Sequence, residues 1–426
     1  MKLQQLKEYV STEDFREKLA PLYPGKVTEN AARYGKLLEM YEQEFGSEDA
    51  DIRLFSAPGR TEIGGNHTDH QHGRVLAASV DMDMIAAASM NDSGIIRIKS
   101  QGYPICEISV SELDVKEEEK NSTASLIRGI AAYFARQEGC AISGLDAVVM
   151  SAVLPGSGIS SSAAFEVLVG NIINTLFNEG KADAVKIAQI GQYAENVYFG
   201  KPSGLMDQMA SSVGNILTID FADNEHPVVR RLNVDFEKTG LALCIIDSGA
   251  DHADLTDEYA AIPKEMKKVC ALFGKKVLRE IPREKFMARL HDVRKAAGDR
   301  AVLRSIHFYT DNDRVPLQAK ALEQGDYDTF LELVKESGRS SWMCLQNITP
   351  LGSSSHQEMA VALAVCHALL GERGAFRVHG GGFAGTCQAF VPVEMLESFK
   401  TGIIGLLGVD RCHVLHIRSV GGCCVL

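Results

Sequence analysis

The sequence lacks the patterns that mark zinc proteins, disulfide-stabilised proteins and membrane proteins. Its 10 cysteines include no Cys-X-X-Cys pair, which disfavours a metal site or a disulfide framework and fits a reducing cytosol. No run approaches the roughly 18 apolar residues that predict a membrane-spanning helix. The N-terminal stretch Met1–Phe15 is charged throughout and has no apolar core of a signal peptide. We therefore expect a cytoplasmic protein.

Basic residues are also scarce relative to acidic ones. The chain carries 44 Lys and Arg against 56 Asp and Glu, a formal net charge of -12. Nucleic acids and anionic membranes both prefer a basic surface, so neither is expected as a partner. We expect a small-molecule ligand instead, and a monomer.

What the chain does have is enough apolar material for large cores, with 426 residues of which 45% are hydrophobic. That length suggests two domains or one large domain. Residues 1–50 have helical apolar spacing and are predicted to form a helical extension. We place one domain at 51–225 and a second at 226–426, because the composition turns polar near 224–238.

A glycine- and serine-rich loop separates an expected strand, 145–153, from an expected helix. The helix is predicted because Ala164, Val167, Leu168 and Ile172 recur at helical spacing. A helix N-terminus with free N–H groups and little side chain in front of it is a typical phosphate site. No lysine follows the second glycine, so the loop is not a Walker A motif. A serine-capped tight turn without a ligand is the alternative.

A second polar stretch, 57–73, follows an expected strand at 52–56. It contains one arginine, three histidines, two carboxylates and two amides among four glycines. We expect a loop here whose polar side chains converge on a ligand, although a solvated turn would have a similar composition. His70 and His72 lack a third ligand at suitable spacing, which disfavours zinc.

Two further places stand out later in the chain. Asp207 follows the turn residues 200–204 at an expected helix start, where it is either a catalytic carboxylate or a first-turn charge. Three glycines, 380–382, lie between two expected strands, 376–379 and 388–391. They form a hairpin turn or let the backbone approach a ligand closely.

Together these stretches resemble the three ordered motifs of the GHMP small-molecule kinases. The sequence Arg60…His67-Thr68-Asp69, the loop 155–164 and the 380–383 glycine motif occur in the family's order. Within that superfamily the chain is similar to galactokinases, because Gly-Lys-Pro-Ser-Gly-Leu-Met-Asp-Gln at 200–208 and Glu258-Tyr259 also fit. The resemblance covers about residues 51–420.

The resemblance implies an α+β fold of two domains, with mixed or antiparallel sheets flanked by helices and the active site in the cleft between the domains. It implies an ATP- and Mg2+-dependent sugar 1-kinase. Asp207 would be the base or charge partner of the C1 hydroxyl, and Arg60 would lie near it and near the γ-phosphate. The sugar-binding residues implied are Asn66, His67, Asp69, Gly204 and Tyr259. The ATP-binding residues implied are Pro155, Gly156, Ser157, Gly158, Ile159, Ser160, Ser161, Ser162 and Ala163, with Ser161 or Ser162 on Mg2+.

The chain departs from the galactokinase pattern near the sugar motif. Asn66 stands where these kinases usually have Glu, and Glu62 stands where they have Asn. An amide is neutral and both donates and accepts hydrogen bonds, so an acidic sugar would be tolerated better. Galactose is the expected substrate, with galacturonate or another galacto-configured sugar as the alternative. A sensor that binds sugar and ATP without catalysis is the alternative of another class.

Overall fold

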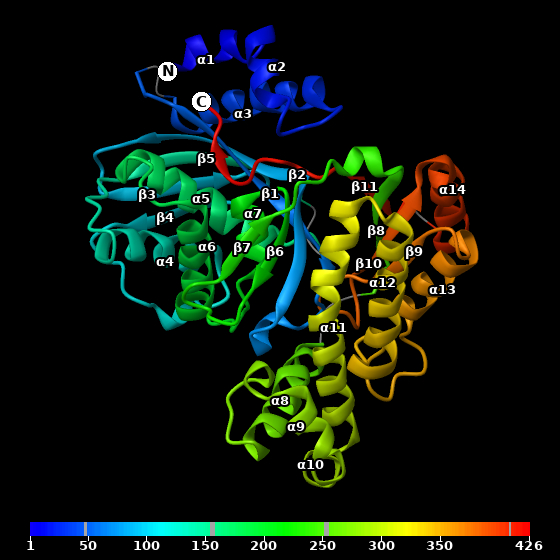
Figure 1. Ribbon diagram of the computed structural model, residues 1–426. Helices are drawn as coiled ribbons and strands as arrows, with labels where there is room; N and C mark the ends of the chain where they lie inside the picture. The colour runs from blue at the N-terminus through cyan, green and yellow to red at the C-terminus, as the bar shows by residue number, and fades with distance from the viewer. Residues whose placement is uncertain (47–48, 154–157, 251–254, 409) are drawn as a thin grey trace.

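The computed structural model describes residues 1–46, 49–153, 158–250, 255–408 and 410–426, and Figure 1 shows its arrangement of helices around two sheets. The helices are α1 (Leu3–Tyr9), α2 (Glu13–Leu19), α3 (Val27–Phe45), α4 (Thr123–Arg136), α5 (Ser161–Phe177), α6 (Ala184–Tyr193), α7 (Met206–Val213), α8 (Thr256–Leu272), α9 (Arg283–Ala288), α10 (Leu290–Ala297), α11 (Asp299–Gln324), α12 (Tyr327–Ser340), α13 (Glu358–Leu370) and α14 (Leu396–Leu407). The strands are β1 (Arg53–Gly64), β2 (Arg74–Met90), β3 (Ile95–Ser100), β4 (Ile105–Ser109), β5 (Leu145–Ser151), β6 (Ile216–Asp220), β7 (Val228–Arg231), β8 (Leu241–Asp247), β9 (Ala375–Val378), β10 (Thr386–Pro392), β11 (Cys412–Leu415) and β12 (Cys423–Cys424).

The larger sheet is built around the 17-residue strand β2. Its order is β12-β1-β2-β5-β3-β4, and β6 and β7 continue from the first half of β2. Only β3 and β5 pair in parallel among the described strands, so this sheet is mixed. The smaller sheet, β11-β8-β10-β9, is antiparallel. The predicted α+β class with mixed and antiparallel sheets is confirmed.

Alternation along the strands of the larger sheet assigns its two faces to different helices. Leu54, Ile85 and Val148 pack under the N-terminal helices, whereas their neighbours Phe55 and Ala86 face the core that contains α4 and α5. Successive side chains of a strand point to opposite faces, so both faces of this sheet are apolar and both are covered. The predicted helices of the first 50 residues are present and lie on the outer face (Figure 1).

The smaller sheet is covered by α13 and α14 on one face and by α12 on the other (Figure 1). The long helix α11 runs between the two sheets and contacts β1, β2 and β6 as well as α12. Residues of α11 and α12, among them Val315 and Phe330, belong to the same buried cluster as the core of the larger sheet. The seam between the two sheets is therefore packed, and it positions the side chains described below.

Several expected boundaries change in the structure. The stretch 57–64 was expected to be a loop, and this is wrong: it continues β1, which is buried from Leu54 to Gly64. Pro58 and Gly59 lie at a register shift between β1 and β2, where a strand tolerates such residues. Only residues 65–73 connect β1 to β2, and they include a short 3-10 turn at Asp69–Gln71.

The proposed domain division at 225 stays a prediction. β7 and β12 lie beyond that position in the chain, yet both belong to the larger sheet. Among the described residues, no helix is long and apolar enough to cross a membrane. All 10 cysteines lie within the described ranges and are free thiols.

Candidate active site

An arginine and an aspartate from distant parts of the chain form a paired ion contact at the seam. Arg60 of β1 donates from Nε to Oδ1 of Asp207, over 2.7 Å, and from Nη2 to Oδ2, over 2.9 Å. The arginine side chain is 8% exposed and the aspartate side chain 33%. Asp207 lies in the first turn of α7, where the free N–H groups favour a carboxylate. The predicted neighbours Arg60 and Asp207 are thus brought together.

The charge state of this pair follows from its surroundings. Burial pushes the pKa of Asp207 upward, but Arg60 and the hydroxyl of Ser160 outweigh burial and hold the pKa below its ordinary value. Asp207 is therefore ionised at neutral pH. Its oxygens accept bonds from Arg60 and, over 2.8 Å, from Ser160, which leaves lone pairs for a further donor.

The serine loop is attached directly to β1. The N–H of Arg60 donates to the carbonyl of Ile159 over 3.0 Å, and Nη1 of Arg60 donates to the carbonyl of Gly158. Ser160 has a left-handed backbone with φ of 58°, and α5 begins at the next residue. Ser161 and Ser162 occupy the first turn, and Ala163 is buried behind them. Three of the predicted ATP-binding residues, Pro155, Gly156 and Ser157, lie outside the described residues.

The β9–β10 hairpin supports the serine loop from the other sheet. A Cβ at Gly158, whose φ is +70°, would lie 2.2 Å from Oγ1 of Thr386 and 3.0 Å from Nδ1 of His379. The N–H of Glu62 donates to Nε2 of His379 over 3.2 Å, so the proton is on Nδ1, which donates to Thr386 over 3.1 Å. Burial, with Arg60 and Arg377 nearby, holds the pKa of His379 well below its ordinary range. His379 is a neutral support between the two sheets.

Asp69 is a second carboxylate close to Asp207. Its Oδ1 accepts a bond from the N–H of His70 over 2.9 Å. A Cβ at Gly204 would lie 1.9 Å from its Oδ2, so only glycine fits beside it. Burial, and then the charge of Asp207, raise the pKa of Asp69 to about 6.

His67 lies in the same loop, and its Nε2 donates to the carbonyl of Gly381 over 2.9 Å. Burial lowers the pKa of His67 to about 4, so this ring is neutral.

Asn66, an expected sugar-binding residue, has its side chain engaged in contacts within the protein. It is fully buried, and both donors and the acceptor of its side-chain amide bind protein groups. Nδ2 donates to Glu62 over 3.0 Å and to the carbonyl of Gly380 over 2.7 Å. Oδ1 accepts from Asn347 over 3.0 Å and from Ser341 over 3.2 Å. In this arrangement Asn66 joins β1 to the hairpin and to the segment 341–347 that follows α12, and its amide has no capacity left for a ligand.

Tyr259 packs against the glycine motif. A Cβ at Gly381 would lie 2.3 Å from its ring, and its hydroxyl donates to the carbonyl of Gly382 over 2.6 Å. Its ring meets Phe383 edge-on, with 5.5 Å between the centroids. Burial raises its pKa to about 12. The expected neighbours 259 and 380–383 are thus in contact.

A buried carboxylate near the serine loop, Glu166, was not predicted from the sequence. Glu166 lies four residues after Ser162, so the two share one face of α5. Its Oε2 accepts from Gln208 over 2.8 Å, whereas its Oε1 is buried without a hydrogen-bond partner. Burial raises its pKa well above the ordinary value. The signal available in the sequence was a lone Glu in an otherwise apolar helix, Ser-Ala-Ala-Phe-Glu-Val-Leu.

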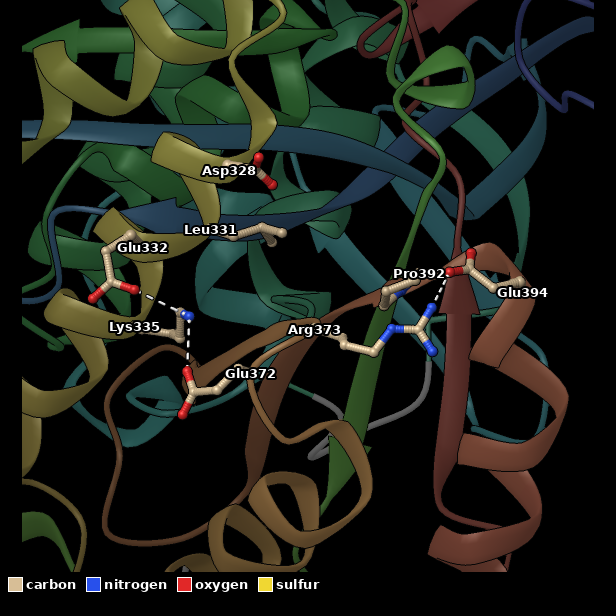
Figure 2. A pocket seen from close by; sticks show the side chains of 8 residues that line it. All are labelled: Asp328, Leu331, Glu332, Lys335, Glu372, Arg373, Pro392 and Glu394. Atoms are coloured by element: carbon tan, nitrogen blue, oxygen red, sulfur yellow. Dashed lines mark hydrogen bonds and ion pairs between the residues drawn. The ribbon is translucent and has the colours of Figure 1, made fainter.

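A hollow of about 400 Å3 lies elsewhere, between α12 and the ends of β9 and β10 (Figure 2). Five of its six charged side chains pair with one another. Lys335 binds Glu332 and Glu372, and Arg373 binds Glu394. These charges neutralise each other and do not converge on a common point. The Arg60–Asp207 site is therefore the better candidate for the active site.

Comparisons with known proteins agree with this geometry. Residues 39–90 match the galactokinase galactose-binding signature, and residues 125–215 match the GHMP kinases N terminal domain. In these two ranges, which make up about a third of the chain, the protein is similar to GHMP kinases. It is a phosphotransferase with an alcohol group as acceptor. The first matched range contains Arg60 and Asp69, and the second contains the serine loop and Asp207.

Solved structures share the fold. Lactococcus lactis galactokinase, solved with galactose, has 22% identity and a TM-score of 0.79 over 92% of this chain and 99% of that chain. Methanococcus jannaschii mevalonate kinase has 13% identity and a TM-score of 0.60 over 87% of this chain and 99% of that chain. Streptococcus pneumoniae phosphomevalonate kinase, solved with phosphomevalonate and AMPPNP, has 12% identity and a TM-score of 0.60 over 85% and 99%. The two-domain kinase fold expected from the motifs is confirmed.

Proposed function

We propose that this phosphotransferase is a galactokinase, which transfers the γ-phosphoryl group of ATP to the C1 hydroxyl of galactose. The observation that carries the proposal is the Arg60–Asp207 pair, which joins the sugar motif to the serine loop through Ser160 and Gly158. The match of residues 39–90 to a galactose-binding signature supports the choice of sugar.

The proposed reaction forms a bond between the C1 oxygen and phosphorus and breaks the bond between phosphorus and the ADP oxygen. The hydroxyl proton passes to water. Such transfers depend on alignment and charge neutralisation more than on covalent help from the protein. Asp207, held ionised by Arg60, accepts the C1 hydroxyl and orients it. Because its pKa is lowered, Asp207 is a weak base, and its main contribution is orientation and charge. Arg60 cannot act as a base and stabilises the negative charge that develops.

The other predicted residues have proposed places around this pair. Asp69, His67, Gly204 and Tyr259 would form the sugar side of the site. Gly158 to Ala163, with the preceding loop, would hold the phosphates of ATP at the N-terminus of α5.

Mg2+ is proposed to bind at Ser162. The residues fit a cation because Oε1 of Glu166 is a buried oxygen without a partner on the same face of α5. Mg2+ uses few protein ligands and keeps water and phosphate oxygens. When bound, it would neutralise the phosphate charge.

Ser162→Ala should raise the Mg2+ concentration that gives half-maximal rate, whereas Ser161→Ala should mainly raise KM for ATP. Unchanged Mg2+ and ATP dependence in both variants would contradict the assignment.

A coupled assay of ADP release tests the proposal. Galactose, galacturonate, glucose and N-acetylgalactosamine are supplied with ATP and Mg2+, and the product is examined by 31P and 13C NMR. We expect the highest kcat/KM with galactose and phosphate on C1. Higher kcat/KM with galacturonate would replace the substrate but keep the chemistry. Binding of sugar and ATP without ADP release would favour the sensor function.

A further inference from the structure

Glu62 shares a strand face with the proposed catalytic arginine. The pairing of Arg60, Thr61 and Glu62 with Ser79, Ala78 and Ala77 of β2 is regular, and the register shifts lie on either side of this segment. Side chains alternate along a regular strand, so Arg60 and Glu62 point to the same side of β1. That side is the one on which Arg60 reaches Asp207.

The two carboxylate oxygens of Glu62 have different surroundings. Oε1 accepts from Nη2 of Arg377 over 2.5 Å and from Nδ2 of Asn66 over 3.0 Å. Oε2 accepts no hydrogen bond from the described residues, and it is not among their fully buried polar atoms without a partner. The side chain as a whole is 4% exposed. One oxygen is therefore anchored, and the small exposed part of the side chain leaves the other open to a ligand.

Burial and hydrogen bonding act on Glu62 in opposite directions. Burial outweighs the effect of Arg377, Arg60 and Asn66, so the pKa of Glu62 lies above its ordinary value. Both groups bound to Oε1 donate through nitrogen, and one of them is a guanidinium that stays charged. An ionised carboxylate accepts hydrogen bonds only, and a sugar hydroxyl is a suitable donor for it.

We propose that Glu62 is a specificity-determining residue whose Oε2 accepts a hydroxyl of the sugar, and that Asn66 and Arg377 position it. The inference rests on the proposed function of the site. It assigns to Glu62 the contact that was expected of Asn66, whose amide is fully used within the protein. With Asp69 and Asp207 nearby, a third carboxylate selects a neutral sugar over one that carries its own carboxylate.

The test compares wild type and Glu62→Gln on galactose, galacturonate and the 2-, 3-, 4- and 6-deoxygalactoses. One charge-assisted hydrogen bond corresponds to about 10- to 100-fold in kcat/KM. We expect a loss of that size for galactose, with KM for ATP unchanged. For one deoxygalactose, kcat/KM should be the same in the variant as in wild type, because the hydroxyl that this sugar lacks is the one that Glu62 binds. The ratio of kcat/KM for galacturonate to that for galactose should rise.

Two further variants separate this role from a merely structural one. Glu119→Gln removes a carboxylate from another buried arginine, Arg128, which it contacts over 2.6 and 2.7 Å; its sugar preferences should equal those of wild type. Glu62→Gln/Arg377→Met removes the cation together with the charge, in case the single variant does not fold. The double variant should lose the same factor in kcat/KM for galactose. The same deoxygalactose should again have the kcat/KM that it has with wild type.

An equal loss on every deoxygalactose, with an unchanged galacturonate ratio, would overturn the assignment of Glu62 while leaving the kinase proposal intact. By contrast, a wild-type protein that phosphorylates none of the sugars would contradict the proposed function itself. The two failures are distinguishable because the first is seen in a variant of an active enzyme.

Discussion

At the scale of single residues, two neighbouring carboxylates have pKa values moved in opposite directions. Arg60 and Ser160 lower the pKa of Asp207 against the effect of burial. Burial and the charge of Asp207 raise that of Asp69. A pair of carboxylates separated in this way performs two tasks at one pH. Asp207 is permanently charged, whereas Asp69 titrates close to the physiological range.

Asp207→Asn should abolish most turnover because it removes the charge that we propose orients the C1 hydroxyl. We expect kcat to fall by about 10²- to 10⁴-fold, while galactose still binds. Ser160→Ala is the comparison variant: of the bonds to Asp207 it deletes only the one of 2.8 Å, and it should change kcat by less than about tenfold. Steady-state kinetics and thermal melting of each variant provide the measurement. A folded Asp207→Asn enzyme with near-normal kcat would reduce Asp207 to a first-turn charge of α7.

The pH dependence of sugar use should report Asp69. Ionised Asp69 is proposed to accept sugar hydroxyls, so kcat/KM for galactose should fall as the pH drops through about 6. Asp207 contributes nothing in that range because its pKa is lowered. Asp69→Asn should lower kcat/KM and remove the inflection. If the inflection persists in that variant, it belongs to another group.

Stability should change in the opposite sense over the same range. Because the folded pKa of Asp69 lies above its ordinary value of 3.8, its contribution to stability is present below that value and is lost as the pH rises through about 6. The melting temperature of the Asp69→Asn variant should therefore rise relative to that of wild type as the pH rises through that window.

At the scale of elements, the sequence predicted the helices better than the site-bearing strand. The serine-loop helix, α7 with Asp207 in its first turn, and the hairpin of β9 and β10 were all expected from apolar spacing and turn residues. The second half of β1 was not, because it contains Pro58, Gly59 and charged residues in a fully buried strand. Their partners come from α7, β9 and β10, between 147 and 327 residues away, and no local pattern reveals such pairing.

The loop from β1 to β2 is fixed in the same way through Asn66. Its N–H donates to Asp311 over 2.7 Å, and its carbonyl accepts from His307 over 2.9 Å, both from α11. The sequence alone suggested that Asn66 sets sugar specificity. The structure instead places it inside a saturated network, a property that depends on residues 66, 341 and 347 meeting in space.

Asn66→Glu should therefore destabilise the protein rather than adjust its substrate preference. The change places a carboxylate about 3 Å from Oε1 of Glu62, and it removes two donated bonds. Like charges in a buried site, with acceptors left unpaired, cost several kcal/mol. Chemical denaturation should show a loss of about 3 kcal/mol or more. Asn66→Asp, which is smaller, should lose a similar amount, and a stable Asn66→Glu enzyme with altered sugar preference would restore the original interpretation.

At the scale of the whole molecule, Asp83 joins the N-terminal helices, the larger sheet and the C-terminal segment. It is fully buried on β2 and accepts bonds from Tyr23 and Ser56, from Arg33 of α3 over 2.8 Å, and from Arg418 over 3.2 Å. Burial raises its pKa, but Arg33 and Arg418 outweigh burial and hold the pKa below its ordinary value. Figure 1 shows both termini beside the N-terminal helices α1–α3.

Asp83→Asn should loosen the whole assembly, because it leaves Arg418, itself fully buried, without its charge partner. Breaking a buried pair from one side costs about 3–5 kcal/mol, so the variant should melt well below wild type. Asp51→Asn is the matched control: its pair with the N-terminal amine has an aspartate side chain that is 68% exposed, and such pairs contribute about 0–1 kcal/mol.

The lowered pKa of Asp83 also fixes the sign of the pH effect. The stability that Asp83 provides is present above its ordinary pKa of 3.8 and is lost as the pH falls through its folded value. Acidification should therefore destabilise wild type more than Asp83→Asn, and the two melting curves should approach each other at low pH. Equal melting temperatures of Asp83→Asn and Asp51→Asn at neutral pH would mean that the extension is held by the apolar contacts of α1–α3 alone.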